Sequence, residues 1–183
     1  MKNFVYIVLF LLTLLKSFSH RSYHSAFIKT DGSLWVMGTN SDGQLGDGST
    51  SDKHSPILIV SENVEYVSLG RDFTLFIKTN GSLWGMGDNS YGQLGDNTTV
   101  DKHTPIEIVP SGVKGAYAGD YHSMYWMTDG SLWTMGKGGD GILGNGSTTN
   151  MSSPIKIVNS GVNNAVGGLN FTSFTKSDSS HWA

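Results

Sequence analysis

Cysteine is absent from the sequence, which excludes disulfide bonds, thiolate metal ligands and a cysteine nucleophile. Proline is scarce, with four residues, so the chain is neither collagen-like nor a proline-rich linker. Charged residues make up only 15% of the chain, and such a composition argues against a disordered protein. The net charge is −3 and the cations are scattered singly. Without a basic stripe, no nucleic-acid partner is expected.

Glycine and aromatic residues are the abundant classes. The chain has 24 glycines among its 183 residues, and aromatic residues make up 11%. Glycine at this level indicates many tight turns, because glycine adopts positive φ without strain. The aromatic content and the chain length suffice for one domain with a sizeable core.

The first 19 residues have the layout of a secretory signal peptide. Lys2 provides a positive start, residues 4–15 are apolar apart from Thr13, and small residues stand at 17 and 19. This pattern predicts cleavage after Ser19. The apolar segment is shorter than the roughly 20 residues that a membrane-spanning helix needs. Residues 20–183 are then expected to be secreted, or periplasmic in a cell with two membranes, with no stable membrane span. A buried helix and an uncleaved anchor remain the alternatives.

The chain repeats itself every 49 residues, and this feature governs the fold prediction. The first two units, 24–72 and 73–121, agree at 27 of 49 positions, and a third unit spans 122–170 before an incomplete one at 171–183. Two sets of residues keep the step and are expected to be structural: Trp35, Trp84, Trp133 and Trp182, and Gly38, Gly87 and Gly136.

Each unit is expected to form four strands, which in the first unit cover 24–30, 33–38, 56–60 and 64–69. The Asp31-Gly32 pair between two apolar runs is typical of a tight hairpin. No convincing helix follows residue 20. Four short antiparallel strands recurring near every 50 residues are what a propeller blade requires. The predicted fold is all-β: a partial β-propeller of about 3.3 four-stranded antiparallel blades, with the repeated Trp, Leu and Met side chains filling the space between blades.

One stretch also indicates a family. Residues 31–47 read Asp-Gly-Ser-Leu-Trp-x-Met-Gly-x-Asn-x-x-Gly-Gln-Leu-Gly-Asp, residues 80–96 repeat this with Asn80 first, and 112–119 read Gly-Val-x-x-x-x-Ala-Gly. The pattern resembles the repeat of the regulator of chromosome condensation family over residues 22–182. The resemblance implies a seven-bladed propeller with a ring of loops on each face.

The chain departs from that family pattern in length and in its later units. It holds too few units for a seven-bladed ring, the third unit drifts at 137–145, and the fourth stops in mid-blade. Three explanations stay open: a fragment of a larger propeller, self-association through the open ends, or a small open arc that is stable alone.

The search for catalytic and metal chemistry finds little. The loop at Asn40 and Asp42 lacks the ligand spacing of a calcium loop, and His54 and His103 recur without a third ligand. No nucleophile elbow, phosphate loop or zinc motif is present, so neither cofactor nor metal is expected and the protein is not expected to be an enzyme. One enzymatic alternative remains, a hydrolase using loop carboxylates drawn from Asp42, Asp47, Asp96 and Asp140.

Loop positions that vary among the units supply the candidate partner-binding residues. The variable sets include 42, 91 and 140; 71–72, 120–121 and 169–170; and 39, 88 and 137. The candidates chosen from them are Asp42, Arg71, Asp72, Tyr91, Asp120, Tyr121 and Asp140. Tyrosine is a frequent contact residue in interfaces, although the same variation also fits neutral drift on a solvated rim.

The leading functional hypothesis is therefore a secreted, non-enzymatic binding module with a protein partner. The family resemblance adds two further possibilities. It implies either a nucleotide-exchange regulator of a small GTPase or a secreted enzyme inhibitor, both by analogy of fold.

Overall fold

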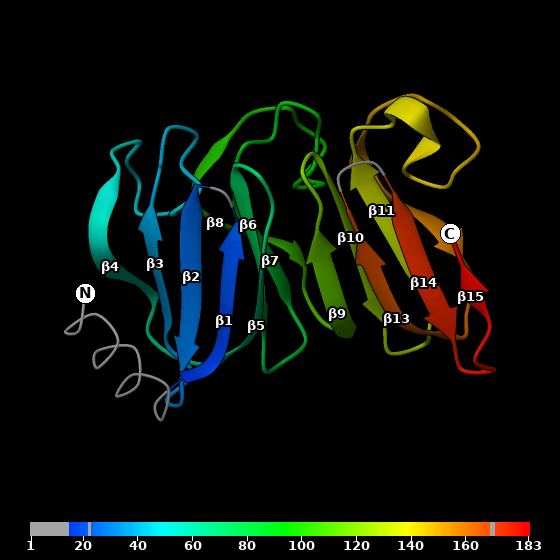
Figure 1. The fold of residues 1–183 in the computed structure, drawn as a ribbon, viewed down its shortest axis with the longest axis horizontal. Helices are drawn as coiled ribbons and strands as arrows, with labels where there is room; N and C mark the ends of the chain where they lie inside the picture. The colour runs from blue at the N-terminus through cyan, green and yellow to red at the C-terminus, as the bar shows by residue number, and fades with distance from the viewer. Residues whose placement is uncertain (1–14, 22, 169–170) are drawn as a thin grey trace, which may run out of the picture.

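The computed structural model describes residues 15–21, 23–168 and 171–183, and these form four antiparallel sheets (Figure 1). The first sheet contains β1 (Leu15–Arg21), β2 (His24–Lys29), β3 (Leu34–Gly38) and β4 (Lys53–Val60). The second contains β5 (Val64–Leu69), β6 (Phe73–Lys78), β7 (Leu83–Gly87) and β8 (Lys102–Val109). The third contains β9 (Val113–Ala118), β10 (His122–Met127), β11 (Leu132–Gly136) and β12 (Met151–Val158). The fourth contains β13 (Val162–Gly167), β14 (Thr172–Lys176) and β15 (His181–Trp182).

The sheets stand side by side along the long axis of the molecule in chain order (Figure 1). A single 3₁₀ turn, η1 (Gly139–Gly141), interrupts the β structure in the described part of the chain. The prediction of an all-β, partial propeller built from four-stranded antiparallel blades is confirmed.

The second, third and fourth sheets each combine strands of two neighbouring sequence units. β5 belongs to the first 49-residue unit, but it is hydrogen-bonded to β6 of the second, with Val67 opposite Phe76. The same step recurs where β9 pairs with β10 and where β13 pairs with β14. The sheets are therefore offset from the sequence units by one strand, which ties every unit to the next.

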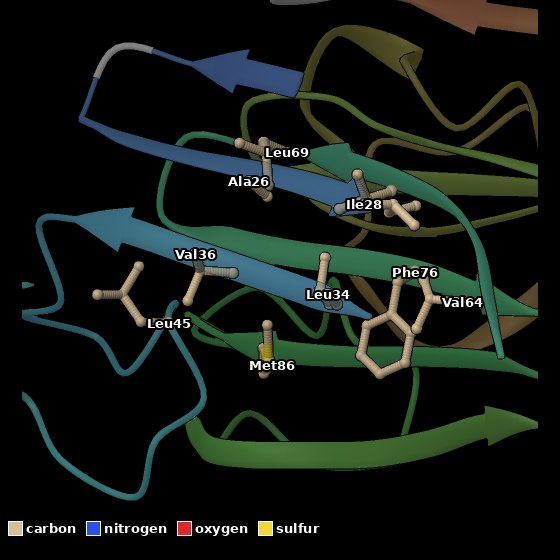
Figure 2. Close-up of a cluster of buried hydrophobic side chains, with 10 residues drawn as sticks. Ala26, Ile28, Leu34, Val36, Leu45, Val64, Leu69, Phe76 and Met86 are labelled. Atoms are coloured by element: carbon tan, nitrogen blue, oxygen red, sulfur yellow. The ribbon is translucent and has the colours of Figure 1, made fainter. Parts of the chain in front are cut away.

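Apolar side chains fill the space between successive sheets. Between the first and second sheets, Ile28 and Leu34 pack against Val64, Phe76 and Met86, and all five are fully buried (Figure 2). Similar clusters join the second sheet to the third and the third to the fourth. Burial on this scale is the main stabilising term, at roughly 1.5–3 kcal/mol for each large apolar side chain.

Of the repeated tryptophans, which were expected to fill the space between blades, Trp84 and Trp133 pack against the edges of these clusters and are only partly buried. Each indole is half-buried or more exposed, and Trp182 is 51% exposed. Each stacks at 6.1–6.4 Å on an aromatic ring of the neighbouring strand: Phe27, Phe76, Tyr125 or Phe174. Each indole N–H also donates to the serine hydroxyl two residues earlier, as Trp84 does to Ser82 at 2.8 Å. The indole covers the edge of the core because its polar N–H needs a partner.

The repeated glycines allow two strands of one sheet to approach closely. Gly87 has φ of 106°, and a Cβ placed there would lie 2.5 Å from the carbonyl oxygen of Asp72. Gly38 and Gly136 repeat this geometry at the ends of β3 and β11. Only glycine fits both the dihedral angle and the space.

The predicted signal peptide overlaps the first sheet. Residues 1–14 lie outside the described residues, whereas residues 15–21 form β1 and pair with β2 from Leu15–Lys29 to Arg21–His24. The predicted cleavage point after Ser19 thus falls inside a strand. Among the residues that the structure describes, no helix is long and apolar enough to cross a membrane.

The face of the fourth sheet that points away from the third sheet is more polar than the corresponding face of the second sheet. Ser173, Thr175 and His181 stand where the second unit has Leu75, Ile77 and Leu83. Ser173 Oγ lies 3.2 Å from His181 Nε2. Val166 and Phe171 are nevertheless about half exposed, and β15 is the last strand of its sheet. Self-association through the open ends stays a prediction.

Candidate functional site

One set of connections gathers the variable residues at a single end of the sheets. Because neighbouring strands are antiparallel, the connections after β3, β5, β7, β9 and β11 lie together, at the top of Figure 1. We call residues 39–52, 70–72, 88–101, 119–121 and 137–150 the upper rim.

A buried asparagine organises each of the first two long rim loops. The Asn89 amide donates to Asp96 Oδ1 at 3.0 Å and to the Thr98 carbonyl at 3.1 Å, and its oxygen accepts the Leu94 N–H at 2.9 Å. Asn40 makes the equivalent bonds in the first loop. The third loop has Gly138 in this place and forms η1 instead. The drift of unit three in sequence therefore changes the shape of its loop.

Hydrogen bonds between sheets hold each long loop in place. Thr74 Oγ1 on β6 donates to the Gln44 carbonyl at 2.9 Å, and Ser123 Oγ on β10 donates to the Gln93 carbonyl at 2.7 Å. His24 is 1% exposed and its Nε2 lies 3.0 Å from Thr74 Oγ1. The rim is a rigid platform, since its loops are bonded to the sheet beside them.

Two of the carboxylates considered for a hydrolase, Asp47 and Asp96, form ion pairs that stabilise the rim loops. Asp47 lies 2.7 Å from Lys53 Nζ, and Asp96 lies 2.8 Å from Lys102 Nζ. Burial by itself would raise the pKa of Asp47, but bonds from Lys53, Ser49 and Asn40 lower it to about 2. The same opposing causes lower the pKa of Asp96. Both groups thus stabilise loops as carboxylates, and neither is suited to donate a proton at neutral pH. Within the described ranges, no three His, Asp or Glu side chains stand where they could hold a metal.

Three carboxylates converge where the first and second sheets meet at the upper rim. These are Asp42, Asp72 and Asp88, from three different connections. The pKa of Asp72 is raised chiefly by burial and then by the charge of Asp42, with Asp88 adding to it, while Arg71 opposes the rise. Asp88 is fixed by Gln93, whose amide donates to it at 2.7 Å. We call these three residues the acidic triad.

The same three structural positions carry different chemistry at the next junction. One 49-residue step along the chain, the triad positions hold Tyr91, Tyr121 and Lys137. The two rings meet edge to face at 5.5 Å. Lys137 Nζ lies 5.7 Å from the centre of the Tyr91 ring and 5.1 Å from that of Tyr121, which is cation–π range.

Arg71 lies between the two groups. Its guanidinium contacts the Tyr121 ring at 5.4 Å and the Tyr121 hydroxyl, while its Nε lies 3.4 Å from Asp72. The triad, the tyrosine pair, Lys137 and Arg71 therefore form one continuous surface, which we call the rim cluster.

The rim cluster contains five of the seven candidate residues chosen from the sequence: Asp42, Arg71, Asp72, Tyr91 and Tyr121. Asp120 is next to the cluster in the chain, and Asp140 is exposed within η1 at φ of 60°. Asp88 and Lys137 were missed as candidates, although their variation at one repeat position could have identified them.

The upper rim as a whole is acidic. Arg71 and Lys137 are its two cations, against nine of the 15 carboxylates of the chain: Asp42, Asp47, Asp52, Asp72, Asp88, Asp96, Asp101, Asp120 and Asp140. Lys53 and Lys102, at the start of the adjoining strands, offset two of these. The rim keeps an excess of negative charge, which would attract positive groups of a partner.

A cavity of about 790 Å³ lies at the opposite end of the sheets. Its lining includes Glu65, Tyr66, Lys114 and Trp126, together with turns at 79–81 and 112. Burial raises the pKa of Tyr66, and the charges in the lining are of mixed sign. The cavity is separate from the rim cluster, and its lining also varies between repeats, since Glu65 and Lys114 occupy the same repeat position.

Comparison with protein-family models gives one consistent match. The model of the regulator of chromosome condensation (RCC1) repeat matches residues 31–77, 80–126 and 129–174, and a second model of that repeat matches 64–93. Among curated protein sequences, none matches the chain.

Solved structures show the same fold at low identity. The chain resembles Prp20p of Saccharomyces cerevisiae with a TM-score of 0.74 at 20% identity, covering 86% of this chain and 42% of that one. It resembles yeast RCC1 (Prp20) in the complex with Kap60 with a TM-score of 0.75 at 18% identity, covering 90% and 42%. Human WBSCR16 is similar with a TM-score of 0.53 at 19% identity, covering 88% and 57%. The chain thus spans less than half the length of the first two structures.

Proposed function

Since the chain belongs to the regulator of chromosome condensation (RCC1) repeat family, we propose that it is a secreted, non-enzymatic module that binds a protein partner through the rim cluster. The observation that carries the proposal is the change of chemistry at fixed positions. Three sites of one scaffold hold an acidic triad at one junction and Tyr91, Tyr121 and Lys137 at the next. A surface of varied chemistry on a rigid frame suits specific recognition.

The composition of the rim cluster supports a protein interface. Tyrosine and arginine are enriched among the residues that contribute most to binding energy. Tyr91 and Tyr121 pack against each other, and Arg71 and Lys137 contact the Tyr121 ring. Side chains ordered before association lose less entropy when a partner arrives.

The solved relatives support a protein partner in general terms. Prp20p is described with binding properties toward Gsp1p and histones, and yeast RCC1 (Prp20) is described bound to Kap60. Nucleotide-exchange regulation and enzyme inhibition remain the alternative proposals by family analogy. Secretion, inferred from the first 19 residues, favours an extracellular partner over an exchange factor.

Substitution of the two tyrosines tests the proposal. We expect Tyr91→Ala and Tyr121→Ala each to weaken partner capture by about 10- to 100-fold, because each removes an aromatic contact from the centre of the rim cluster. The measurement is quantitative mass spectrometry of proteins retained from extracellular fluid by the immobilised chain, at several chain concentrations.

Tyr66→Ala is the matched control, since Tyr66 is 40% exposed and lines the cavity at the opposite end. Circular dichroism must show that all three variants keep the β structure. Undiminished capture by the folded Tyr91→Ala and Tyr121→Ala variants would remove the rim cluster from the function.

A further inference from the structure

We infer that the partner presents a basic segment to the rim cluster, with a lysine or arginine side chain docking on the acidic triad. The inference rests on the proposed function and specifies the chemistry of its partner. Three observations carry it: the charge of the rim, the contacts made by the triad carboxylates and the cations that already contact the tyrosine rings.

The charge balance of the rim favours a positive partner. The upper rim holds nine carboxylates and two cations, although the net charge of the whole chain is only −3. Lys53 and Lys102 pair with two of these carboxylates. Other cations, including Lys29, Lys78 and Lys176, lie beside the opposite connections. Such a separation of charge steers an oppositely charged partner toward one end of the molecule.

The three carboxylates of the acidic triad make one ion pair, between Asp72 and Arg71. Arg71 lies 3.4 Å from Asp72, whereas Asp42 accepts a bond from the Ser41 hydroxyl and Asp88 accepts bonds from Gln93 and the Ser90 N–H. Burial, followed by the charges of Asp42 and Asp88, raises the pKa of Asp72 against the opposing effect of Arg71. A cationic side chain placed among the three carboxylates would relieve the repulsion between them.

The tyrosine pair shows that this surface accommodates cations. Lys137 Nζ and the Arg71 guanidinium both approach the Tyr121 ring, at 5.1 and 5.4 Å. Partly buried tyrosine rings next to carboxylates form a setting that suits a lysine or arginine side chain, whose methylene stem packs on a ring while its charge meets the acid. An acidic segment would instead meet three carboxylates beside two cations, one of them already paired with Asp72.

Defined peptides test the inference directly. The probe is a soluble peptide of alternating lysine and glycine, compared with peptides in which glutamate or serine replaces lysine. Binding is measured by titration of the ¹⁵N-labelled chain at low salt. We expect the lysine peptide to shift the amide signals of Asp42, Asp72, Asp88, Tyr91 and Tyr121, and we expect added salt to weaken that binding. The glutamate and serine peptides are expected to leave those signals unchanged.

A charge-matched pair of variants provides the control. We expect Asp42→Asn with Asp72→Asn to weaken binding of the lysine peptide by about tenfold or more. Asp31→Asn with Asp129→Asn changes the net charge equally at the opposite connections and is expected to alter affinity by less than about twofold. Asparagine is tolerated there, since Asn80 holds the same turn position and accepts the same bonds from Ser82.

The outcomes separate this inference from the proposed function. Equal binding of the glutamate peptide, or equal loss of affinity in both double variants, would overturn the basic-segment inference. If the tyrosine variants lose partner capture while Asp42→Asn with Asp72→Asn keeps it, the proposed function stands and this inference falls. If the tyrosine variants keep capture, the proposed function itself falls.

Discussion

We expect Phe76→Ala to lower the free energy of unfolding by about 3–5 kcal/mol, as for other large buried side chains truncated in a packed core. Phe76 is fully buried on β6 and lies in the cluster that joins the first and second sheets. Its removal leaves a cavity between two rigid sheets that cannot close around it. Urea unfolding followed by circular dichroism measures the change.

Trp84→Ala is the matched comparison, because Trp84 stacks on Phe76 at 6.2 Å but is only half-buried. The indole N–H of Trp84 donates to the Ser82 hydroxyl, and Lys78 Nζ lies 4.2 Å from the centre of the indole ring. Much of the indole surface therefore faces the edge of the sheet. We expect Trp84→Ala to cost less than Phe76→Ala. A larger cost for Trp84→Ala would place the indole, and not the apolar cluster, at the centre of the packing.

We expect a chain starting at residue 20 to be less stable than one starting at residue 15 by about 3–6 kcal/mol. Residues 15–19 make most of β1, and their loss leaves the backbone groups of β2 without partners along one edge. Each lost hydrogen bond costs roughly 0.5–1.5 kcal/mol net, and β2 would become an exposed edge strand. Chemical unfolding of the two chains under identical conditions measures the difference.

The position of signal-peptide cleavage determines whether the mature protein keeps β1. A signal peptide cut after Ser19 removes most of β1, whereas a cut before Leu15 preserves it. Intact-mass measurement of the secreted protein locates the cut. Equal stability of the two chains would contradict the contribution of β1 to the first sheet.

The strands and turns could be read from the sequence because their signals are local. Apolar runs flanking Asp31-Gly32, Asn80-Gly81 and Asp129-Gly130 define hairpins, and a 49-residue period repeats them. The four strands expected in the first unit correspond to β2, β3, β4 and β5. Fold class and family followed from this pattern.

The assignment of strands to sheets was beyond sequence reasoning. β5 is separated from β4 by residues 61–63 and from β6 by residues 70–72. Connections of equal length give no preference for either neighbour, so hydrogen bonding across the unit boundary has no local signature. The partial exposure of the tryptophans could not be predicted from the sequence either, because it depends on how adjacent sheets pack.

The candidate site was identified in part. Variation at fixed repeat positions pointed to Tyr91 and Tyr121, which the structure brings to 5.5 Å. Lys137 was not chosen as a candidate although position 137 varies among the units, because its contact with Tyr91, 46 positions away in the chain, depends on the second and third sheets standing side by side. The acidic triad likewise draws its members from three separate connections.

The sharing of strands between repeats underlies both the packing and the rim cluster, and nuclear Overhauser spectroscopy tests it most directly. In a backbone-resolved spectrum we expect cross-strand contacts between Val67 and Phe76, repeated between Ala116 and Tyr125 and between Ala165 and Phe174. Contacts joining 64–69 to 53–60 in place of 73–78 would mean that each sheet is closed within one repeat, and the arrangement described for the rim cluster would be wrong.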